Sequence, residues 1–328
     1  MSNIGVLGSG AWGTALAQML ASDGRDVLLW TRDPELAATI NTERHNPLYL
    51  PDITLSDTIE ATDALPRMTA LDVLLLVTPA QHMAEVMQRM SVFPRDLVLC
   101  SKGIEAGTGR MMHDVARDIA PDSAIAVLSG PTFAHEVAAG LPTAVTLACS
   151  GGRTQWQRLA ATIARPAFRP YYSEDVIGAE VAGAMKNVLA IACGVVDGLA
   201  LGQNARAALI ARGYAEMQRF GDALGARRET LAGLCGMGDL VLTCTSTASR
   251  NFSLGKALGE GRELAELMHD RHTVAEGAHT APILVDLAHE HDLSMPIAEA
   301  VRDLLGGSDA REIVAGLLAR PLTSENRA

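Results

Sequence analysis

The chain has 328 residues, 48% hydrophobic and 20% charged, which is typical of an ordered protein with about two domains. A formal net charge of −11 argues against a nucleic-acid-binding surface, and it means that a small anionic substrate needs local cations. Five widely spaced cysteines without a C-x-x-C argue against a disulfide framework or a zinc site and favour a reducing compartment.

The first stretch has the pattern of a nucleotide-binding turn. A short apolar run, Ile4–Leu7, is followed at once by Gly8, Gly10 and Gly13 in the spacing G-x-G-x-x-G, and then by a helical pattern. These glycines permit a tight turn, close approach to a pyrophosphate and close packing of helix on strand. The alternative is a glycine-rich structural turn, but the strand–turn–helix context favours dinucleotide binding.

The first half continues as alternating strands and helices. The expected strands are 4–7, 27–30, 73–77, 97–100, 125–128, 144–148 and 168–172. The expected helices are 14–22, 34–41, 81–90, 109–119, 133–139 and 154–163. Because strands such as Val73–Val77 are continuously apolar, they predict a parallel sheet between two helix layers, that is, a Rossmann-type doubly wound α/β fold. No apolar run approaches the ~20 residues of a membrane span, and no signal peptide is expected.

Several expected strands end in polar or glycine turns. Thr78-Pro79, Ser101-Lys102-Gly103 and Ser129-Gly130-Pro131-Thr132 each follow such a strand. The carboxyl ends of strands border the ligand crevice in an open α/β sheet. This topology places Lys102 and Gly130 near a nucleotide, although Lys102 reads equally well as a solvated loop lysine.

The second half is dominated by helix formers. Residues 176–197 and 205–224 predict long helices, the second of them ended by Gly225, and shorter helical pieces follow to Leu318. We therefore expect a dinucleotide-binding domain over residues 1–175 and an all-helical domain over residues 176–328. The active cleft is expected between them.

Two polar positions in the helical half lie in apolar surroundings. Lys186-Asn187 interrupts a long apolar run, where a lysine is costly to bury unless it is paired. A buried lysine can serve in proton transfer, whereas a lysine that snorkels from one helix face needs no function. Asp239, flanked by glycine, reads most simply as a helix N-cap.

A third stretch has the composition of a phosphate cradle. The hydroxyls of residues 243–246 lead into Ser249-Arg250-Asn251 at an expected helix start. Hydroxyls, a guanidinium and a helix N-terminus together bind phosphate well. The alternative is an N-capping Ser249 beside a solvated Arg250. The nine histidines form no recognisable metal-ligand set.

Cofactor choice depends on Thr31-Arg32-Asp33, at the end of the second expected strand. An acid there selects the ribose of NAD, whereas an arginine accommodates the 2′-phosphate of NADP. Asp33 precedes Pro34, so it is well placed as an N-cap that leaves Arg32 free to reach the ribose. We therefore expect both cofactors to work, with NADPH preferred.

In combination, these motifs resemble those of bacterial NAD(P)-dependent glycerol-3-phosphate dehydrogenases over nearly the whole chain. The motifs that carry the resemblance are Gly8 to Ala17, Ser101-Lys102-Gly103, Ser129 to Ala134, Lys186-Asn187, Asn204-Ala205-Arg206, Gly238-Asp239-Leu240, Thr243-Cys244-Thr245, Ser249-Arg250-Asn251, Val274 and Glu276-Gly277. Departures such as Ala211, where the family usually has threonine, concern packing more than chemistry.

The resemblance implies roles for individual residues. Lys186 would be the general acid/base, with Asp239 and Lys102 as further catalytic residues. The implied ligands of glycerol phosphate are Lys102, Gly130, Thr132, Lys186, Asp239, Ser249, Arg250 and Asn251. The implied cofactor contacts are Gly8, Gly10, Ala11, Trp12, Gly13, Arg32, Lys102, Ala134, Arg250, Val274 and Glu276.

The resemblance also implies an activity: reduction of dihydroxyacetone phosphate to sn-glycerol 3-phosphate with NADPH or NADH, which supplies phospholipid synthesis in the cytoplasm. Family members are commonly homodimers, although the sequence shows no distinct interface stripe. Two other interpretations are a dehydrogenase of the same plan with another small substrate, and a catalytically silent nucleotide sensor. Substrate profiling separates the first, and turnover separates the second.

Overall fold

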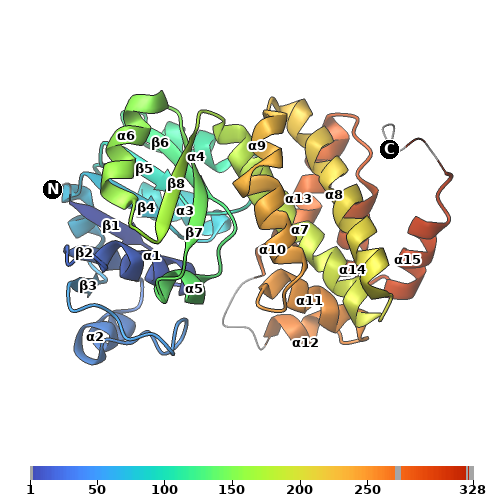
Figure 1. The fold of residues 1–328 in the computed structure, drawn as a ribbon, viewed down its shortest axis with the longest axis horizontal. Coiled ribbons are helices and arrows are strands. Elements are labelled where there is room, and N and C mark those ends of the chain that lie inside the picture. Colours follow the sequence, from blue (N-terminus) through green and yellow to red (C-terminus); the bar gives the residue numbers. More distant parts are fainter. Residues whose placement is uncertain (1–2, 270–274, 323, 325–328) are drawn as a thin grey trace. The chain divides into compact units, whose positions relative to one another are not determined.

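The computed structural model describes residues 3–269, 275–322 and 324. The chain forms two compact units, which Figure 1 shows in the colours of the sequence. The N-terminal unit comprises Met1–Lys102 and Arg110–Glu180, and the C-terminal unit comprises Gly103–Gly109 and Val181–Ala328.

An eight-stranded sheet forms the centre of the N-terminal unit, in the order β3-β2-β1-β4-β5-β6-β7-β8. Its strands are β1 (Ile4–Leu7), β2 (Val27–Trp30), β3 (Ile59–Thr62), β4 (Val73–Leu76), β5 (Asp96–Leu99), β6 (Ala124–Ser129), β7 (Thr143–Cys149) and β8 (Phe168–Ser173). The reversal of strand order on either side of β1 confirms the predicted Rossmann-type, doubly wound arrangement.

Two features of the sheet differ from the sequence prediction. β7 pairs antiparallel with β6, so a wholly parallel sheet was wrong at this one pair. The connecting helix α5 (Ala134–Ala138) has five residues and rises only about 7.5 Å, too little to return the chain along the six-residue β6. The sequence prediction also missed β3, a short strand that includes an exposed Glu60.

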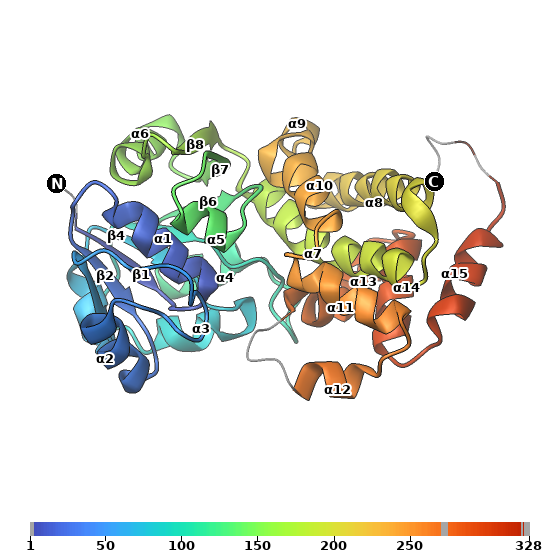
Figure 2. The same ribbon diagram turned by 60° about the horizontal axis from the view of Figure 1, so that its bottom comes forward.

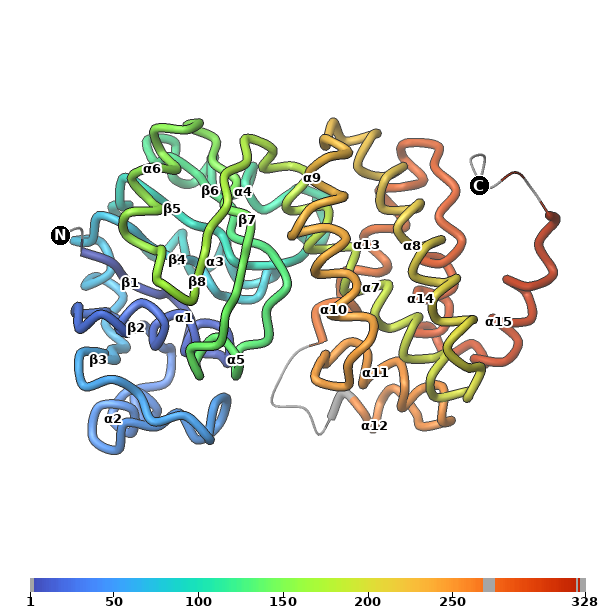
Figure 3. The backbone as a smooth tube through the Cα atoms, viewed as in Figure 1, coloured from blue at the N-terminus to red at the C-terminus, as the bar shows by residue number. Residues whose placement is uncertain are grey.

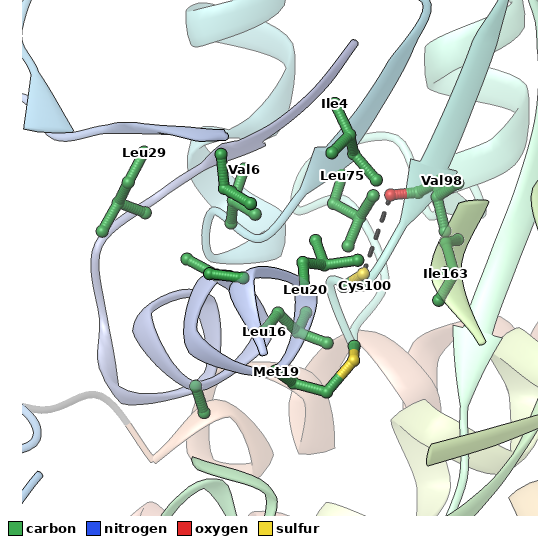
Figure 4. Packing of buried hydrophobic residues seen from close by; sticks show 14 of the residues in the cluster. Ile4, Val6, Leu16, Met19, Leu20, Leu29, Leu75, Val98, Cys100 and Ile163 are labelled. Atoms are coloured by element: carbon green, nitrogen blue, oxygen red, sulfur yellow. Dashed lines mark hydrogen bonds between the residues drawn. The ribbon is translucent and has the colours of Figure 1, made fainter. Parts of the chain in front are cut away.

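Helices cover the sheet on both sides, as Figure 2 shows. Besides α5 they are α1 (Ala11–Ala21), α2 (Pro34–Glu43), α3 (Ala80–Gln88), α4 (Met112–Ile119) and α6 (Gly152–Ile163), with a 3₁₀ turn at Leu65–Ala70. α1 packs on the sheet through Leu16 and Leu20, which belong to the same buried cluster as Val6 and Leu75 (Figure 4). Burial of these side chains holds the start of α1 at the carboxyl end of β1.

Apart from Gly103–Gly109 and the connecting loops, the described part of the C-terminal unit is helical, and Figure 3 traces its path from yellow to red. Its helices are α7 (Val176–Gly198, which begins in the N-terminal unit), α8 (Gly202–Leu224), α9 (Arg228–Ala232), a π-helical turn (Leu234–Gly238), α10 (Asp239–Cys244), α11 (Arg250–Gly259), α12 (Leu264–His269), α13 (Glu276–Glu290), α14 (Pro296–Leu305) and α15 (Ala310–Leu318). Gly225 ends α8 at a φ of 86°, as predicted.

α7 is the central helix of this half of the chain. It is the one described helix with the length and apolar character of a membrane span, and 94% of its most apolar window is buried within the protein. Its later part packs backbone to backbone against α11: a Cβ at Gly194 or Gly198 would overlap carbonyl oxygens of α11, and one at Gly255 would overlap Ile191 O. These glycines fix where the start of α11 lies relative to the middle of α7.

Glu216 of α8 caps α14 from a neighbouring helix. Its carboxylate oxygens accept the N–H groups of Ile297 at 2.8 Å and Ala298 at 3.2 Å, and the side chain is buried. Burial raises the pKa of Glu216 from 4.5 to about 7, although the two hydrogen bonds from the helix N-terminus oppose the shift. The folded chain therefore binds one more proton here than the unfolded chain between these two pH values.

This difference predicts a pH dependence of stability. The contribution of Glu216 is fully present below its unfolded pKa near 4.5, and it is lost as the pH rises through the folded value of about 7. Between pH 5 and pH 8 we expect the unfolding free energy of the wild type to fall by roughly 2–3 kcal/mol more than that of Glu216→Gln. Urea titrations of both proteins measure the two falls, and equal falls would contradict the assignment.

Candidate active site

The glycine turn has the geometry that a bound pyrophosphate requires. Gly8 has a φ of 124°, in the left-handed region that favours glycine, and a Cβ there would lie 3.0 Å from the backbone of Val77. Nothing lies within 4 Å of a Cβ built on Gly10, and this N-cap residue of α1 has no side chain with which to cap the helix. A Cβ on Gly13 would overlap Gly8 O, so Gly8 and Gly13 have the tight turn and the close helix–strand packing that the spacing predicts.

Polar atoms without partners lie along the same end of the sheet. Thr78 follows β4 and Ser129 ends β6, and each hydroxyl is buried with no hydrogen-bond partner in the described part of the chain. The indole N–H of Trp12, on the first turn of α1, shares this property. Such groups are costly when unpaired, and a dinucleotide offers phosphate, ribose and amide partners. The residues present therefore fit a nicotinamide dinucleotide.

The remaining predicted ligands of the N-terminal unit lie after the carboxyl ends of its strands or at the start of its helices. Lys102 lies in the turn after β5 and is partly buried. Gly130 follows β6, where a Cβ would lie 2.9 Å from Val145 Cα, and the Thr132 hydroxyl donates to Gly130 O at 3.2 Å. Ala134 and Ala11 are the first residues of α5 and α1, two helices that contact each other.

The segment after β2 contains the acid and the arginine on which cofactor choice is expected to depend. The Asp33 carboxylate accepts the N–H groups of Glu35 at 2.9 Å and Leu36 at 3.4 Å, so it caps α2 as the sequence predicted. Arg32, one residue before it, is exposed at the carboxyl end of β2. The acid is thus occupied by backbone donors and the guanidinium faces solvent.

A buried ion pair forms the polar centre of the C-terminal unit. The Lys186 ammonium of α7 donates to Asp239 Oδ1 at 2.6 Å and to the Thr243 hydroxyl at 3.1 Å. Thr243 in turn donates to Asp239 Oδ1 at 3.1 Å, which closes a three-membered network. Lys186 is 6% exposed and Asp239 is fully buried, so the charges are compensated by each other rather than by water.

Two simpler interpretations of these residues were wrong. Lys186 does not snorkel to solvent, because its ammonium is held inside the unit by Asp239. Asp239 is not an N-cap: Gly238 is the N-cap residue, Asp239 is the first residue of α10, and its carboxylate accepts the ammonium of Lys186. The preceding π-helical turn, over Leu234–Gly238, brings Asp239 to this place.

The predicted phosphate cradle lies at the start of α11. Ser249 is its N-cap and accepts the N–H of Phe252 at 3.2 Å. The Arg250 residue is exposed to solvent overall. Desolvation by nearby protein nevertheless lowers the pKa of its guanidinium, and the attraction of Glu276 partly opposes this shift. Asn251 is buried, and its amide donates to Asn187 Oδ1 at 3.0 Å and accepts the Gly277 N–H at 2.9 Å.

Not every predicted site residue can be placed. Glu276 is the first residue of α13, and the start of this helix is held to α11 through Asn251. Val274 lies outside the described residues. The predicted ligands Gly8 to Thr132 belong to the N-terminal unit, whereas Lys186, Asp239 and Ser249–Asn251 belong to the C-terminal unit.

Sequence reasoning singled out Thr243 and Asn187 but gave neither a role in this network. Thr243 bridges Lys186 and Asp239, and Asn187 holds the amide of Asn251. Thr243 lies one helical turn after Asp239, and this i, i+4 spacing could have linked them. Paired glycines four residues apart at 194/198 and 255/259 could have indicated that α7 and α11 cross closely.

A dinucleotide-binding unit joined to a helical unit that buries a Lys–Asp pair defines the class of two-domain, nicotinamide-dependent dehydrogenases. Family models agree with this class. The model for the N-terminus of NAD-dependent glycerol-3-phosphate dehydrogenase matches residues 3–155, and the model for its C-terminus matches residues 175–315. The chain belongs to the family of NAD-dependent glycerol-3-phosphate dehydrogenases.

Individual relatives resemble the chain over its full length. It is 68% identical over 325 residues to a glycerol-3-phosphate dehydrogenase (NAD(P)+) of Erythrobacter litoralis, covering 99% of this chain and 98% of that protein. A protein of the same name from Novosphingobium aromaticivorans is 69% identical over 324 residues, or 98% of each chain. The crystal structure of glycerol-3-phosphate dehydrogenase from Coxiella burnetii superposes with a TM-score of 0.91 at 39% identity, covering 97% of this chain and 99% of that one.

Proposed function

We propose that this chain reduces dihydroxyacetone phosphate to sn-glycerol 3-phosphate with NADPH or NADH, reversibly, and that Lys186 is its general acid/base. Family membership supports the activity, and the buried Lys186–Asp239 pair supports the role of the lysine. We further propose that residues 1–175 form the dinucleotide-binding domain and residues 176–328 the catalytic domain.

The buried Lys186 ammonium of the C-terminal unit is suited to proton transfer. A bound nicotinamide dinucleotide would supply the hydride that reduces the C2 carbonyl carbon of the substrate, and negative charge would grow on the carbonyl oxygen. An ammonium held in place by Asp239 and Thr243 can stabilise that charge and donate the proton that completes the alcohol. Because Asp239 has already oriented the lysine before reaction, little reorganisation is needed in the transition state.

Substrate phosphate is assigned to the start of α11. Arg250 supplies a guanidinium, the helix supplies N–H groups, and the Asn251 amide is held by Asn187 so that it keeps one orientation. Lys102, Gly130, Thr132 and Ser249 complete the proposed substrate ligands. These few cations act locally against a net charge of −11.

The cofactor is assigned to the glycine turn of the N-terminal unit. Gly8, Gly10 and Gly13 shape it, Ala11 and Trp12 offer N–H groups at the start of α1, and Arg32 faces the ribose. Lys102, Ala134, Arg250, Val274 and Glu276 are the further proposed contacts. We also propose that the enzyme is cytoplasmic, serves phospholipid synthesis and forms a homodimer.

Arg32 should decide the preference between the two cofactors. Since Asp33 is occupied by the N-terminus of α2, we expect the wild type to prefer NADPH. Arg32→Ser should weaken NADPH binding by roughly 1.5–3 kcal/mol, about ten- to a hundredfold, and leave NADH binding nearly unchanged. Fluorescence titrations with both cofactors measure this, with Arg89→Ser, an exposed arginine after α3, as the control. Equal losses for the two cofactors, or a wild type that prefers NADH, would refute the assignment.

Comparison of a phosphorylated with an unphosphorylated substrate tests the function itself. We expect NADPH oxidation with dihydroxyacetone phosphate and far weaker oxidation with dihydroxyacetone. At saturating NADPH, Arg250→Ala should lower kcat/KM for dihydroxyacetone phosphate by a factor equivalent to roughly 1.5–3 kcal/mol and barely change kcat/KM for dihydroxyacetone. Equal turnover of the two substrates by the wild type would contradict a requirement for the phosphate. An equal loss of kcat/KM for both substrates in Arg250→Ala would show that Arg250 is not the phosphate ligand.

A further inference from the structure

A second buried charged pair lies outside the proposed site. Glu180 of α7 accepts the backbone N–H of His113 at 2.8 Å with one carboxylate oxygen and contacts His113 Nδ1 at 2.5 Å with the other. Both side chains are buried, at 6% exposure for His113 and 5% for Glu180. The N-cap residue of α4, Met111, makes no side-chain cap, and Glu180 of α7 supplies an acceptor to the N-terminus of α4 instead.

The pKa values of both partners are raised above their ordinary values. Burial would lower the pKa of His113, but its hydrogen bond to Glu180 and the attraction of Glu180 and Asp114 outweigh burial and the opposing Arg117, so the pKa is raised. Burial also raises the pKa of Glu180, although His113 opposes this shift. Both directions favour one shared proton over an isolated buried carboxylate, and the bidentate geometry makes the contact difficult to replace by water.

The Glu180–His113 pair lies close to the points where the chain passes between its two units. The chain passes between its two units after Lys102, after Gly109 and after Glu180. His113 therefore lies three residues after the chain returns to the N-terminal unit, and Glu180 is the last residue before it leaves. The pair joins two of the three crossing points, where hinge residues are expected to lie.

The exit through Glu180 occurs inside a continuous helix. α7 runs without a break from Val176 to Gly198, so its first turn belongs to the N-terminal unit and the rest to the C-terminal unit. Lys186 follows Glu180 by six residues, a rise of about 9 Å along the helix. Contacts that hold the first turn of α7 within the N-terminal unit therefore also hold the start of the helix that carries Lys186.

We infer that Glu180 and His113 are positioning residues, which anchor the root of α7 to the cofactor-binding unit and thereby hold Lys186 in register with the reacting carbonyl. The inference rests on the proposed role of Lys186. Proton transfer is sensitive to small displacements of the donor, whereas most of the proposed cofactor contacts, the glycine turn among them, belong to the N-terminal unit. Loss of the anchor should therefore lower kcat much more than it lowers cofactor affinity.

Removal and conservative replacement of each partner test the anchor. Glu180→Ala and His113→Ala should each lower kcat for dihydroxyacetone phosphate roughly tenfold, with the Kd of NADPH within about twofold of wild type. The double variant should lose no more than either single variant, because the two side chains act as one unit. Glu180→Gln and His113→Asn, which keep an acceptor and a donor in place, should restore kcat to within about threefold. His82→Ala, from an exposed His–Glu pair on α3, is the control and should match wild type.

Three results would overturn the inference. They are kcat values within twofold of wild type in both alanine variants, a parallel loss of kcat and NADPH affinity, or no recovery in the conservative variants. Should either alanine variant fail to fold, Glu180→Asp, which keeps the charge but shortens the reach, takes its place with the same expected tenfold loss. A wild type that does not oxidise NADPH with dihydroxyacetone phosphate would instead refute the proposed function, so the two failures are distinguishable.

Discussion

Lys186→Met is expected to lower kcat by roughly 10²–10⁴, because methionine keeps the bulk of the side chain but cannot donate a proton or stabilise the developing alkoxide. NADPH affinity should change little, since the glycine turn belongs to the other unit. Stopped-flow and steady-state oxidation of NADPH with dihydroxyacetone phosphate give kcat, and a fluorescence titration gives the Kd of the cofactor.

Lys256→Met is a matched control for this variant. Lys256 lies on α11 of the same unit and also pairs with an aspartate, Asp197, at 2.6 Å, but it is partly exposed. We expect its kcat to stay within about twofold of wild type, because a partly exposed ion pair contributes little. Near-normal turnover in Lys186→Met would exclude Lys186 as the acid.

Asp239→Asn is expected to have the second-largest effect, on stability as well as on activity. An amide would leave the Lys186 ammonium buried without a compensating charge, and breaking such a pair destabilises by roughly 3–5 kcal/mol. The lysine would also be released from its orientation, so kcat should fall together with stability. Urea titration measures the free energy of unfolding, and the NADPH assay measures kcat.

Asp222→Asn separates the loss of a buried pair from the loss of any ion pair in this unit. Asp222 pairs with Arg228 at 2.6 Å, with both side chains exposed to solvent. Its replacement should cost at most about 1 kcal/mol and leave kcat unchanged. A similarly small cost for Asp239→Asn would show that the buried pair is not the structural centre of the unit.

Local patterns predicted most of the fold because the strands and helices of the N-terminal unit are consistent with their own sequence. Val73–Leu76 is apolar on both faces and became a central strand, and Asp33 with Pro34 marked the start of α2 correctly. The antiparallel β7 could not be predicted in this way. Its direction depends on how short α5 is, and a local apolar pattern does not carry that information.

The parts of the site that depend on local sequence alone were predictable. The glycine turn specified its backbone geometry, and Ser249 capped its helix as expected. Sequence alone could not decide between a buried and a snorkelling Lys186, because the deciding partner, Asp239, lies 53 residues away on another helix. The roles of Asn187 and Thr243 could not be predicted for the same reason: they exist only once α7, α10 and α11 pack together.

One measurement tests the central claim most directly: the initial rate of NADPH oxidation by the purified chain with dihydroxyacetone phosphate, with the product identified by chiral analysis. We predict substrate-dependent oxidation that yields sn-glycerol 3-phosphate in a 1:1 ratio to NADP formed. NADPH that binds but is not oxidised when dihydroxyacetone phosphate is added, or oxidation that yields no sn-glycerol 3-phosphate, would contradict it.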